Sequence, residues 1–207
     1  KQVTLKLAGA GASVAFNYYG SADEARATEA QVKEMGGNVL AIQGDMTRQA
    51  DVDALVASAL SEFGGSIDIL VNVSGGLIAR KTLAEMDVDF FKAVIDLNLT
   101  STFLTTQACV PHMASGGAIV NLASQAGRDG GGPGASAYAC GKGAVMTFTR
   151  AMAKELGPQN IRVNALCPGM ISTTFHDTFS KDEVRKNVAN ATPLRREGNP
   201  AEIADAV

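Results

Sequence analysis

Short apolar runs alternate along this chain with longer amphipathic stretches, and this alternation constrains the fold more than any other feature. Strands are predicted at residues 13–17, 39–42, 67–73, 118–122 and 161–166. Helices are predicted at residues 21–35, 47–63, 87–113 and 136–156. A β-α-β-α order predicts one parallel sheet with helices on both faces, a doubly wound α/β fold.

Length and composition favour one globular domain spanning residues 1–207. The net charge of −3 gives no reason to expect nucleic-acid binding. No apolar run is long enough to cross a membrane, so a cytoplasmic protein is predicted. The three cysteines, Cys109, Cys140 and Cys167, lie far apart, and each is expected to be a small buried hydrophobe. Two histidines without neighbouring cysteines give no support to a metal site.

One segment conflicts with the regular order. Residues 3–5 read as a first strand, yet the next strand follows after too few residues for a parallel crossover, which needs about a dozen or more. We therefore expect residues to be missing between Leu5 and Lys6. A strand after Val207 is also expected to be missing, because the chain stops inside a helix that begins near Pro200. The alternative at the first position is an antiparallel hairpin with a glycine-rich loop.

Tyr138 and Lys142 stand four residues apart near the start of the predicted helix 136–156. Residues at this spacing share one face of a helix. A nearby cation favours the phenolate and lowers the tyrosine pKa from about 10. The pair is therefore predicted to donate and accept a proton near neutral pH. The alternative is an ordinary helix with one solvated lysine.

Further motifs follow one another in a defined order. They are Asn72-Val73-Ser74-Gly75 after the third strand, Asn98 on the next helix, Ser124 after the fourth strand, Tyr138 with Lys142, and Pro168-Gly169 with Thr173 after the fifth strand. In this order they resemble the short-chain dehydrogenase/reductase family, most closely its 3-oxoacyl-[acyl-carrier-protein] reductase-like branch. The resemblance covers nearly the whole chain and implies a Rossmann fold. Val73 and Ser74 depart from the family's usual Asn-Ala.

The resemblance implies an oxidoreductase that transfers hydride between a nicotinamide cofactor and a carbonyl or secondary alcohol. Tyr138 would be the acid and base, and Lys142 would lower its pKa and hydrogen-bond the nicotinamide ribose. Ser124 would hold the substrate oxygen, and Asn98 would support a water that relays protons. Two structural alternatives stay open, since serine favours turns and Asn98 could be a buried amide that satisfies backbone groups.

The resemblance also implies the cofactor contacts. These are Asn17, Asp45, Asn72, Gly75, Tyr138, Lys142, Pro168, Gly169 and Thr173. Asp45 and Thr173 could instead cap the helices that follow them. No carboxylate follows the strand 13–17 before Asp23, which favours NADP over NAD. The family's glycine-rich phosphate loop would fall in the interruption expected after Leu5.

The expected partners are a small carbonyl or alcohol substrate and further copies of the same chain, as a homotetramer or homodimer. Neither nucleic acid nor membrane is expected. The alternative function is a non-catalytic dinucleotide-binding sensor or scaffold. Loss of the phosphate loop would favour this alternative, because the pyrophosphate would lose its backbone donors.

Overall fold

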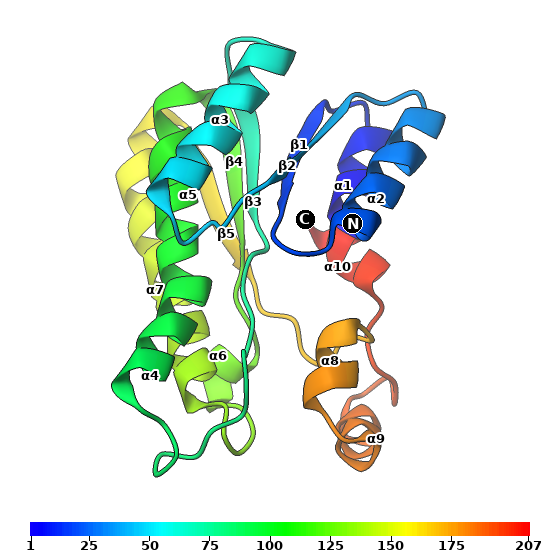
Figure 1. The fold of residues 1–207 in the computed structure, drawn as a ribbon, viewed down its shortest axis with the longest axis vertical. Coiled ribbons are helices and arrows are strands. Elements are labelled where there is room, and N and C mark those ends of the chain that lie inside the picture. Colours follow the sequence, from blue (N-terminus) through cyan, green and yellow to red (C-terminus); the bar gives the residue numbers. More distant parts are fainter.

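A computed structural model describes all residues 1–207 and contains two parallel β-sheets flanked by helices (Figure 1). The first sheet pairs β1 (Val14–Tyr18) with β2 (Val39–Gln43). The second has the order β3 (Ile67–Asn72), β4 (Met113–Leu122) and β5 (Arg162–Leu166). All neighbouring strands are parallel. The predicted doubly wound α/β class is confirmed.

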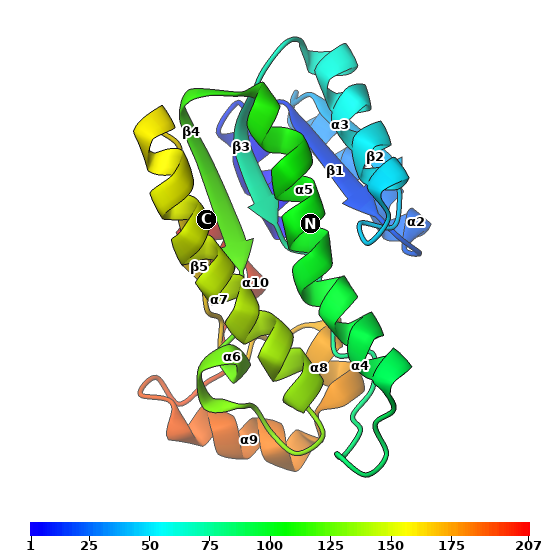
Figure 2. The same cartoon turned by 90° about the vertical axis from the view of Figure 1, so that its left-hand side faces the viewer.

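Helices cover both faces of the sheets (Figure 2). One face carries α3 (Gln49–Phe63), α5 (Ser101–Cys109) and α7 (Ser136–Leu156), and the other carries α1 (Gln2–Gly9), α2 (Ala22–Glu34) and α10 (Pro200–Ala206). Helix α4 (Val88–Ile95) continues into α5 through a π-helical turn, η1 (Asp96–Thr100). Short 3₁₀ turns, η2 (Val110–His112) and η3 (Gly157–Gln159), precede β4 and β5. The helices α6 (Ala126–Asp129), α8 (Thr174–Phe179) and α9 (Asp182–Ala191) lie beyond the carboxyl ends of the strands.

The first segment of the chain is helical, which corrects two expectations. Helix α1 runs without a break through Leu5 and Lys6, and the Leu5 N–H donates to the Lys1 carbonyl at 3.0 Å. Its buried residues are Thr4 and Ala8, which are four apart and share one helix face. The predicted strand at residues 3–5 and the predicted interruption after Leu5 are therefore wrong, and α1 leads directly into β1.

Two predicted helix starts differ in detail. Ser21 precedes α2, but its side chain makes no capping hydrogen bond. Helix α3 follows Arg48 rather than Thr47. Thr47 instead donates its N–H and its hydroxyl to Asp45 Oδ1, at 2.9 and 2.7 Å. Asp45 thus closes the turn before α3. This agrees in part with the alternative that Asp45 caps this helix, although Asp45 binds Thr47 and the residue at the N-cap is Arg48.

A cavity of about 1320 Å³ separates the two sheets, so the single sheet predicted from the sequence is divided. Strands β1 and β3 line this cavity, and the edges that they turn toward it have no strand partner. Apolar side chains of the β3 region stay accessible as a result, with Ile69 45% and Val73 55% exposed. The cavity extends to the carboxyl ends of the strands, where Asn72, Gly75, Pro168 and Thr173 line it.

The buried core of the second sheet fixes the far end of α7. Ile119, Leu156, Ile161 and Val163 form one cluster between β4, β5 and this helix. Cys109 is buried as expected, whereas Cys140 is exposed, so the prediction of three buried cysteines is wrong. No helix combines the length and the apolar character that a membrane crossing requires.

Candidate functional site

The predicted catalytic residues come together beyond the carboxyl end of β4. Ser124 stands two residues after this strand, and Tyr138 and Lys142 lie in the first turns of α7. Helix α6 holds the start of α7 by close backbone contact. A Cβ atom at Gly127 would lie 2.7 Å from the Gly143 nitrogen, so only glycine permits this approach.

Ser124 serves two partners. Its Oγ accepts the Ala126 N–H at 3.2 Å, which closes the turn into α6. Its side chain also lowers the pKa of Tyr138. The capping interpretation of Ser124 therefore holds, and its hydroxyl also acts on the tyrosine.

Tyr138 is largely buried, and burial raises the pKa of its phenol because the charged form is poorly solvated. Ser124 acts in the opposite direction and is the smaller effect. The net shift of this pKa is therefore upward, not downward as the neighbouring Lys142 predicted. At neutral pH the phenol is protonated and can act as an acid.

Lys142 is a buried cation without a carboxylate partner. Its side chain is 5% exposed, and its Nζ donates to the Leu122 carbonyl at 2.6 Å. Burial lowers its pKa to about 8. An ammonium carries three donors, so this single bond leaves two of them for other partners. This burial excludes the alternative of an ordinary helix with a solvated lysine.

Asn98 lies in the π-helical turn η1 and is completely buried. Its Nδ2 donates to the carbonyls of Gly76 and Val94, both at 2.8 Å, and its Oδ1 accepts the Gly76 N–H at 3.1 Å. The amide therefore ties the loop after β3 to the helix, as the structural alternative anticipated. Single π turns are frequent at functional sites, and the relay role of Asn98 stays a prediction.

Gly75 brings the loop after β3 onto Lys142. Its φ is +151°, and a Cβ at this position would lie 2.7 Å from both Asn98 Oδ1 and Lys142 Nζ. A side chain here would displace one of these groups. The predicted contact of Gly75 with the cofactor stays a prediction.

Asn72 turns its side chain into the interior. Its Nδ2 donates to Asn121 Oδ1 at 2.8 Å and to Thr106 Oγ1 at 3.2 Å, and its Oδ1 accepts the Thr105 hydroxyl at 2.6 Å. Asn121 in turn donates to Thr149 of α7 at 2.9 Å. This network fixes the ends of β3 and β4 against α5 and α7, so only the backbone of Asn72 is left for a ligand.

The other predicted cofactor residues fall into two groups, those that line the cavity between the sheets and those that do not. Those that line the cavity between the sheets are Asn17, Asn72, Gly75, Pro168 and Thr173, whereas Asp45 and Gly169 do not line it. Asn17 Nδ2 donates to the Gly44 carbonyl at 3.3 Å, and Thr173 Oγ1 donates to the Ile171 carbonyl at 3.2 Å. The Pro168 carbonyl accepts the Gln125 N–H at 2.9 Å and so links the strand ends of β4 and β5.

An aromatic group beside Tyr138 was missed by the sequence reasoning. The Phe175 ring lies 5.8 Å from the Tyr138 ring, and Phe179 lies 5.1 Å from Phe175. The spacing of these two phenylalanines by four residues, after the predicted strand 161–166, was the available signal. His176 lies between these two phenylalanines in the sequence, and its Nδ1 is 2.9 Å from Ser180 Oγ. Burial lowers the pKa of His176.

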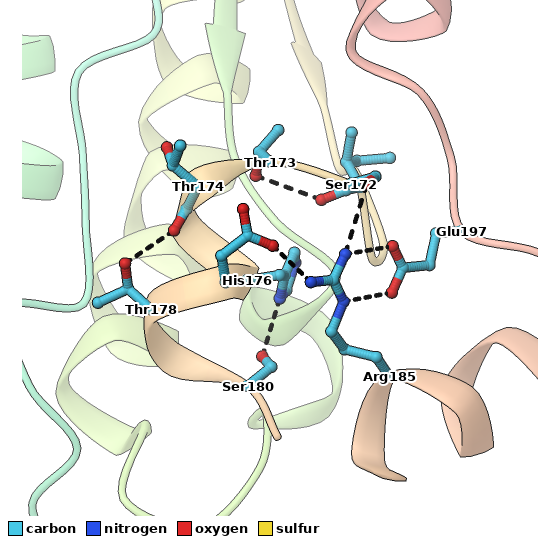
Figure 3. Close-up of polar contacts among 10 residues, drawn as sticks. Ser172, Thr173, Thr174, His176, Thr178, Ser180, Arg185 and Glu197 are labelled. Atoms are coloured by element: carbon cyan, nitrogen blue, oxygen red, sulfur yellow. Dashed lines mark hydrogen bonds and ion pairs between the residues drawn. The ribbon is translucent and has the colours of Figure 1, made fainter. Parts of the chain in front are cut away.

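Helix α8, which carries these rings, is held by an ion-pair cluster (Figure 3). Arg185 of α9 reaches Glu197 through Nε and Nη2, at 2.6 and 2.7 Å, and Asp177 of α8 through Nη1 at 2.5 Å. Its Nη2 also approaches Ser172 Oγ at 3.4 Å. One guanidinium thus joins α8, α9 and the loop before α10.

The residues present fit a nicotinamide dinucleotide. The cavity runs from the end of β1, through Gly75, to Thr173, and its lining does not include Ser124, Tyr138 or Lys142. Lys142 has unused donors, and Tyr18 and Tyr19 rather than a carboxylate follow β1. No group of three or more potential ligands could hold a metal ion.

Comparison with known proteins identifies the family of this chain. The family model described as enoyl-(acyl carrier protein) reductase matches residues 1–207. The 3-oxoacyl-[acyl-carrier-protein] reductase of Synechocystis sp. is 37% identical over the whole chain, which covers 82% of that protein. Among solved structures, a short-chain dehydrogenase/reductase from Serratia marcescens gives a TM-score of 0.92 at 34% identity, over 99% of this chain and 82% of that one.

A blue fluorescent protein from a metagenomic library, solved in complex with NADPH, gives a TM-score of 0.91 at 29% identity, over 99% of this chain and 82% of that one. The chain therefore belongs to the short-chain dehydrogenase/reductase family, in the 3-oxoacyl-[acyl-carrier-protein] reductase-like branch. This is a family of NAD(P)-dependent oxidoreductases, which confirms the resemblance inferred from the motifs.

Proposed function

We propose that this protein reduces a carbonyl compound, or oxidises the corresponding secondary alcohol, with Tyr138 as the acid and base. The observation that carries the proposal is the placement of Tyr138 and the buried cation of Lys142 one helical turn apart on α7, beside the end of β4 where Ser124 stands. When bound, a nicotinamide supplies or accepts the hydride. The protein supplies position, charge stabilisation and the proton.

Ser124 and Tyr138 can both donate to one substrate oxygen. Negative charge grows on this oxygen as the carbonyl is reduced, and donors already aimed at it stabilise that charge. The raised pKa of Tyr138 keeps its proton in place at neutral pH until the oxygen becomes basic enough to take it. In the reverse direction Tyr138 must first lose this proton, so alcohol oxidation is favoured by higher pH.

Lys142 has a second role in the proposal. After proton transfer the tyrosine is anionic, and an ammonium one turn away stabilises this state. With a pKa of about 8, Lys142 is still mostly charged at pH 7 and can also exchange a proton. Its unused donors would hold the nicotinamide ribose, and Thr173 would contact the nicotinamide amide. Asn98 keeps its proposed relay role through a bound water.

The cofactor is proposed to be NADPH in preference to NADH. The absence of a carboxylate between the end of β1 and Asp23 supports this, because an acidic residue there would repel a 2′-phosphate. Asp23 is itself exposed and paired with Arg26. A small carbonyl or alcohol, including a 3-oxoacyl thioester, is the proposed substrate. A cytoplasmic homodimer or homotetramer is proposed on family resemblance.

The test is Tyr138→Phe. We expect this variant to bind NADPH, followed by its fluorescence, while turnover of a ketone panel falls about 10²-fold or more. Unchanged turnover in Tyr138→Phe would contradict the assignment. Binding without turnover in the wild type would favour the sensor alternative.

A further inference from the structure

Helix α8 is attached to the protein by few groups. None of its residues is buried, and none of the residues of α9 is buried either. Its apolar contact is the row of rings formed by Tyr138, Phe175 and Phe179, with centroids 5.8 and 5.1 Å apart. Such distances are typical of attractive aromatic pairs. We call Phe175 and Phe179 the aromatic wall.

Arg80 holds the end of this helix. It lies in the loop after β3, and its Nε donates to the Phe179 carbonyl at 2.9 Å. Phe179 is the last residue of α8, where a cation both satisfies a free carbonyl and interacts favourably with the helix dipole. The Nη1 of Arg80 donates to the Pro133 carbonyl, also at 2.9 Å. Arg80 thus joins three segments that are distant in the sequence.

The glycine-rich run at residues 130–134 is shaped around this arginine. The Lys81 N–H donates to the Gly134 carbonyl at 3.1 Å. Gly134 has φ +75°, and a Cβ there would lie 3.0 Å from the Arg80 Cβ. The run is therefore anchored at its end nearest to α7.

Two arginines hold α8, but they differ in their partners. Arg185 is neutralised by Asp177 and Glu197. Arg80 forms no ion pair with a carboxylate and binds only carbonyl oxygens. Its contribution is therefore directional, because the planar guanidinium donates along two fixed directions at once.

We propose that Arg80 is a positioning residue that fixes the aromatic wall beside Tyr138, and that the wall selects substrates with an aromatic or bulky apolar group on the carbonyl. This inference rests on the proposed function. A carbonyl that accepts from Tyr138 must place one substituent near the Phe175 ring, since this ring packs against the tyrosine. A flat apolar substituent gains contact there, and a methyl group gains little.

Attachment of α8 can be tested without any catalysis. We expect Arg80→Ala to speed tryptic cleavage after Lys181, between α8 and α9, by about tenfold or more, because lost hydrogen bonds from a charged donor raise the open population. The control is Lys81→Ala, which removes the same charge one residue away. Lys81 pairs with Asp87 and does not touch α8. Equal cleavage rates in the two variants would overturn the role of Arg80.

Selectivity is tested with acetophenone and acetone, using NADPH as the donor. We expect Arg80→Ala to lower kcat/KM for acetophenone about tenfold and for acetone less than about threefold, with NADPH binding unchanged. In a Phe175→Leu background the Arg80→Ala change should have little further effect on the ratio, because both act through the wall. An unchanged ratio in Arg80→Ala overturns the selectivity. Absence of wild-type turnover instead contradicts the proposed function, and the proteolysis result still decides the role of Arg80.

Discussion

Replacing Lys142 by methionine should make the protein more stable at neutral pH while abolishing its activity. The lysine pKa falls from its ordinary 10.5 to about 8 because the charge is buried. This difference of about 2.5 pH units, at 1.36 kcal/mol each, amounts to roughly 3 kcal/mol of destabilisation below pH 8. Methionine has a similar volume and carries no charge, so it removes this cost.

The gain is partly offset by the bond from Nζ to the Leu122 carbonyl, whose loss costs about 1 kcal/mol. The expected net stabilisation at pH 7 is therefore about 2 kcal/mol. Between pH 8 and 10.5 the unfolded chain still binds the proton that the native Lys142 has released, so wild-type stability rises with pH in this window. The methionine variant lacks this rise, and its advantage should vanish or reverse near pH 10.5.

Urea unfolding of both proteins at pH 7 and pH 10.5, followed by far-UV circular dichroism, measures the two differences. Other titrating groups are common to both proteins and cancel in the comparison. A difference in unfolding free energy that changes by less than about 0.5 kcal/mol between these pH values would refute the argument, because the lost hydrogen bond alone does not depend on pH. The lysine would then be solvated or paired in solution.

Four further outcomes are expected. Asn98→Ala should lower the free energy of unfolding by about 2 kcal/mol in urea titrations, because it removes three hydrogen bonds to backbone groups, of which the one to the Val94 carbonyl is buried and two are part-buried. Gly75→Ala should reduce turnover about 10²-fold or more in a steady-state assay, since its Cβ would displace the site residues, while circular dichroism shows a retained fold. With a thiol reagent, Cys140 should react in the native protein and Cys109, whose pKa burial raises to about 12, only after unfolding. Because the pKa of Tyr138 is raised, reduction should stay constant through neutral pH and fall only in the alkaline range, whereas alcohol oxidation should rise with pH.

Long periodic segments were predicted well from the sequence. Helix α7 was expected at residues 136–156 and spans Ser136–Leu156, because its many small and apolar residues repeat with a helical period over six turns. The same reasoning failed at residues 3–5, where Val3, Leu5 and Leu7 alternate like a strand but belong to α1. Three apolar residues fit both periods, and only the packing of neighbouring elements decides between them.

The sequence predicted which elements carry the candidate site residues, but not the direction in which the tyrosine pKa shifts. The spacing of Tyr138 and Lys142 correctly placed both on α7, yet the direction of the tyrosine pKa depends on burial, which spacing does not reveal. The inward side chain of Asn72 and the contact between Phe175 and Tyr138 join residues that are distant in the chain.

The π turn η1 makes the helix after β3 sensitive to chain length as well as to side-chain identity. One extra residue in a helical turn rotates everything after it by about 100° relative to a regular α-helix. The phase set at Asp96–Thr100 therefore aims Thr105 and Thr106 at Asn72. Deleting a single residue within η1 would turn both threonines away from β3, although every side chain of α5 would be unchanged.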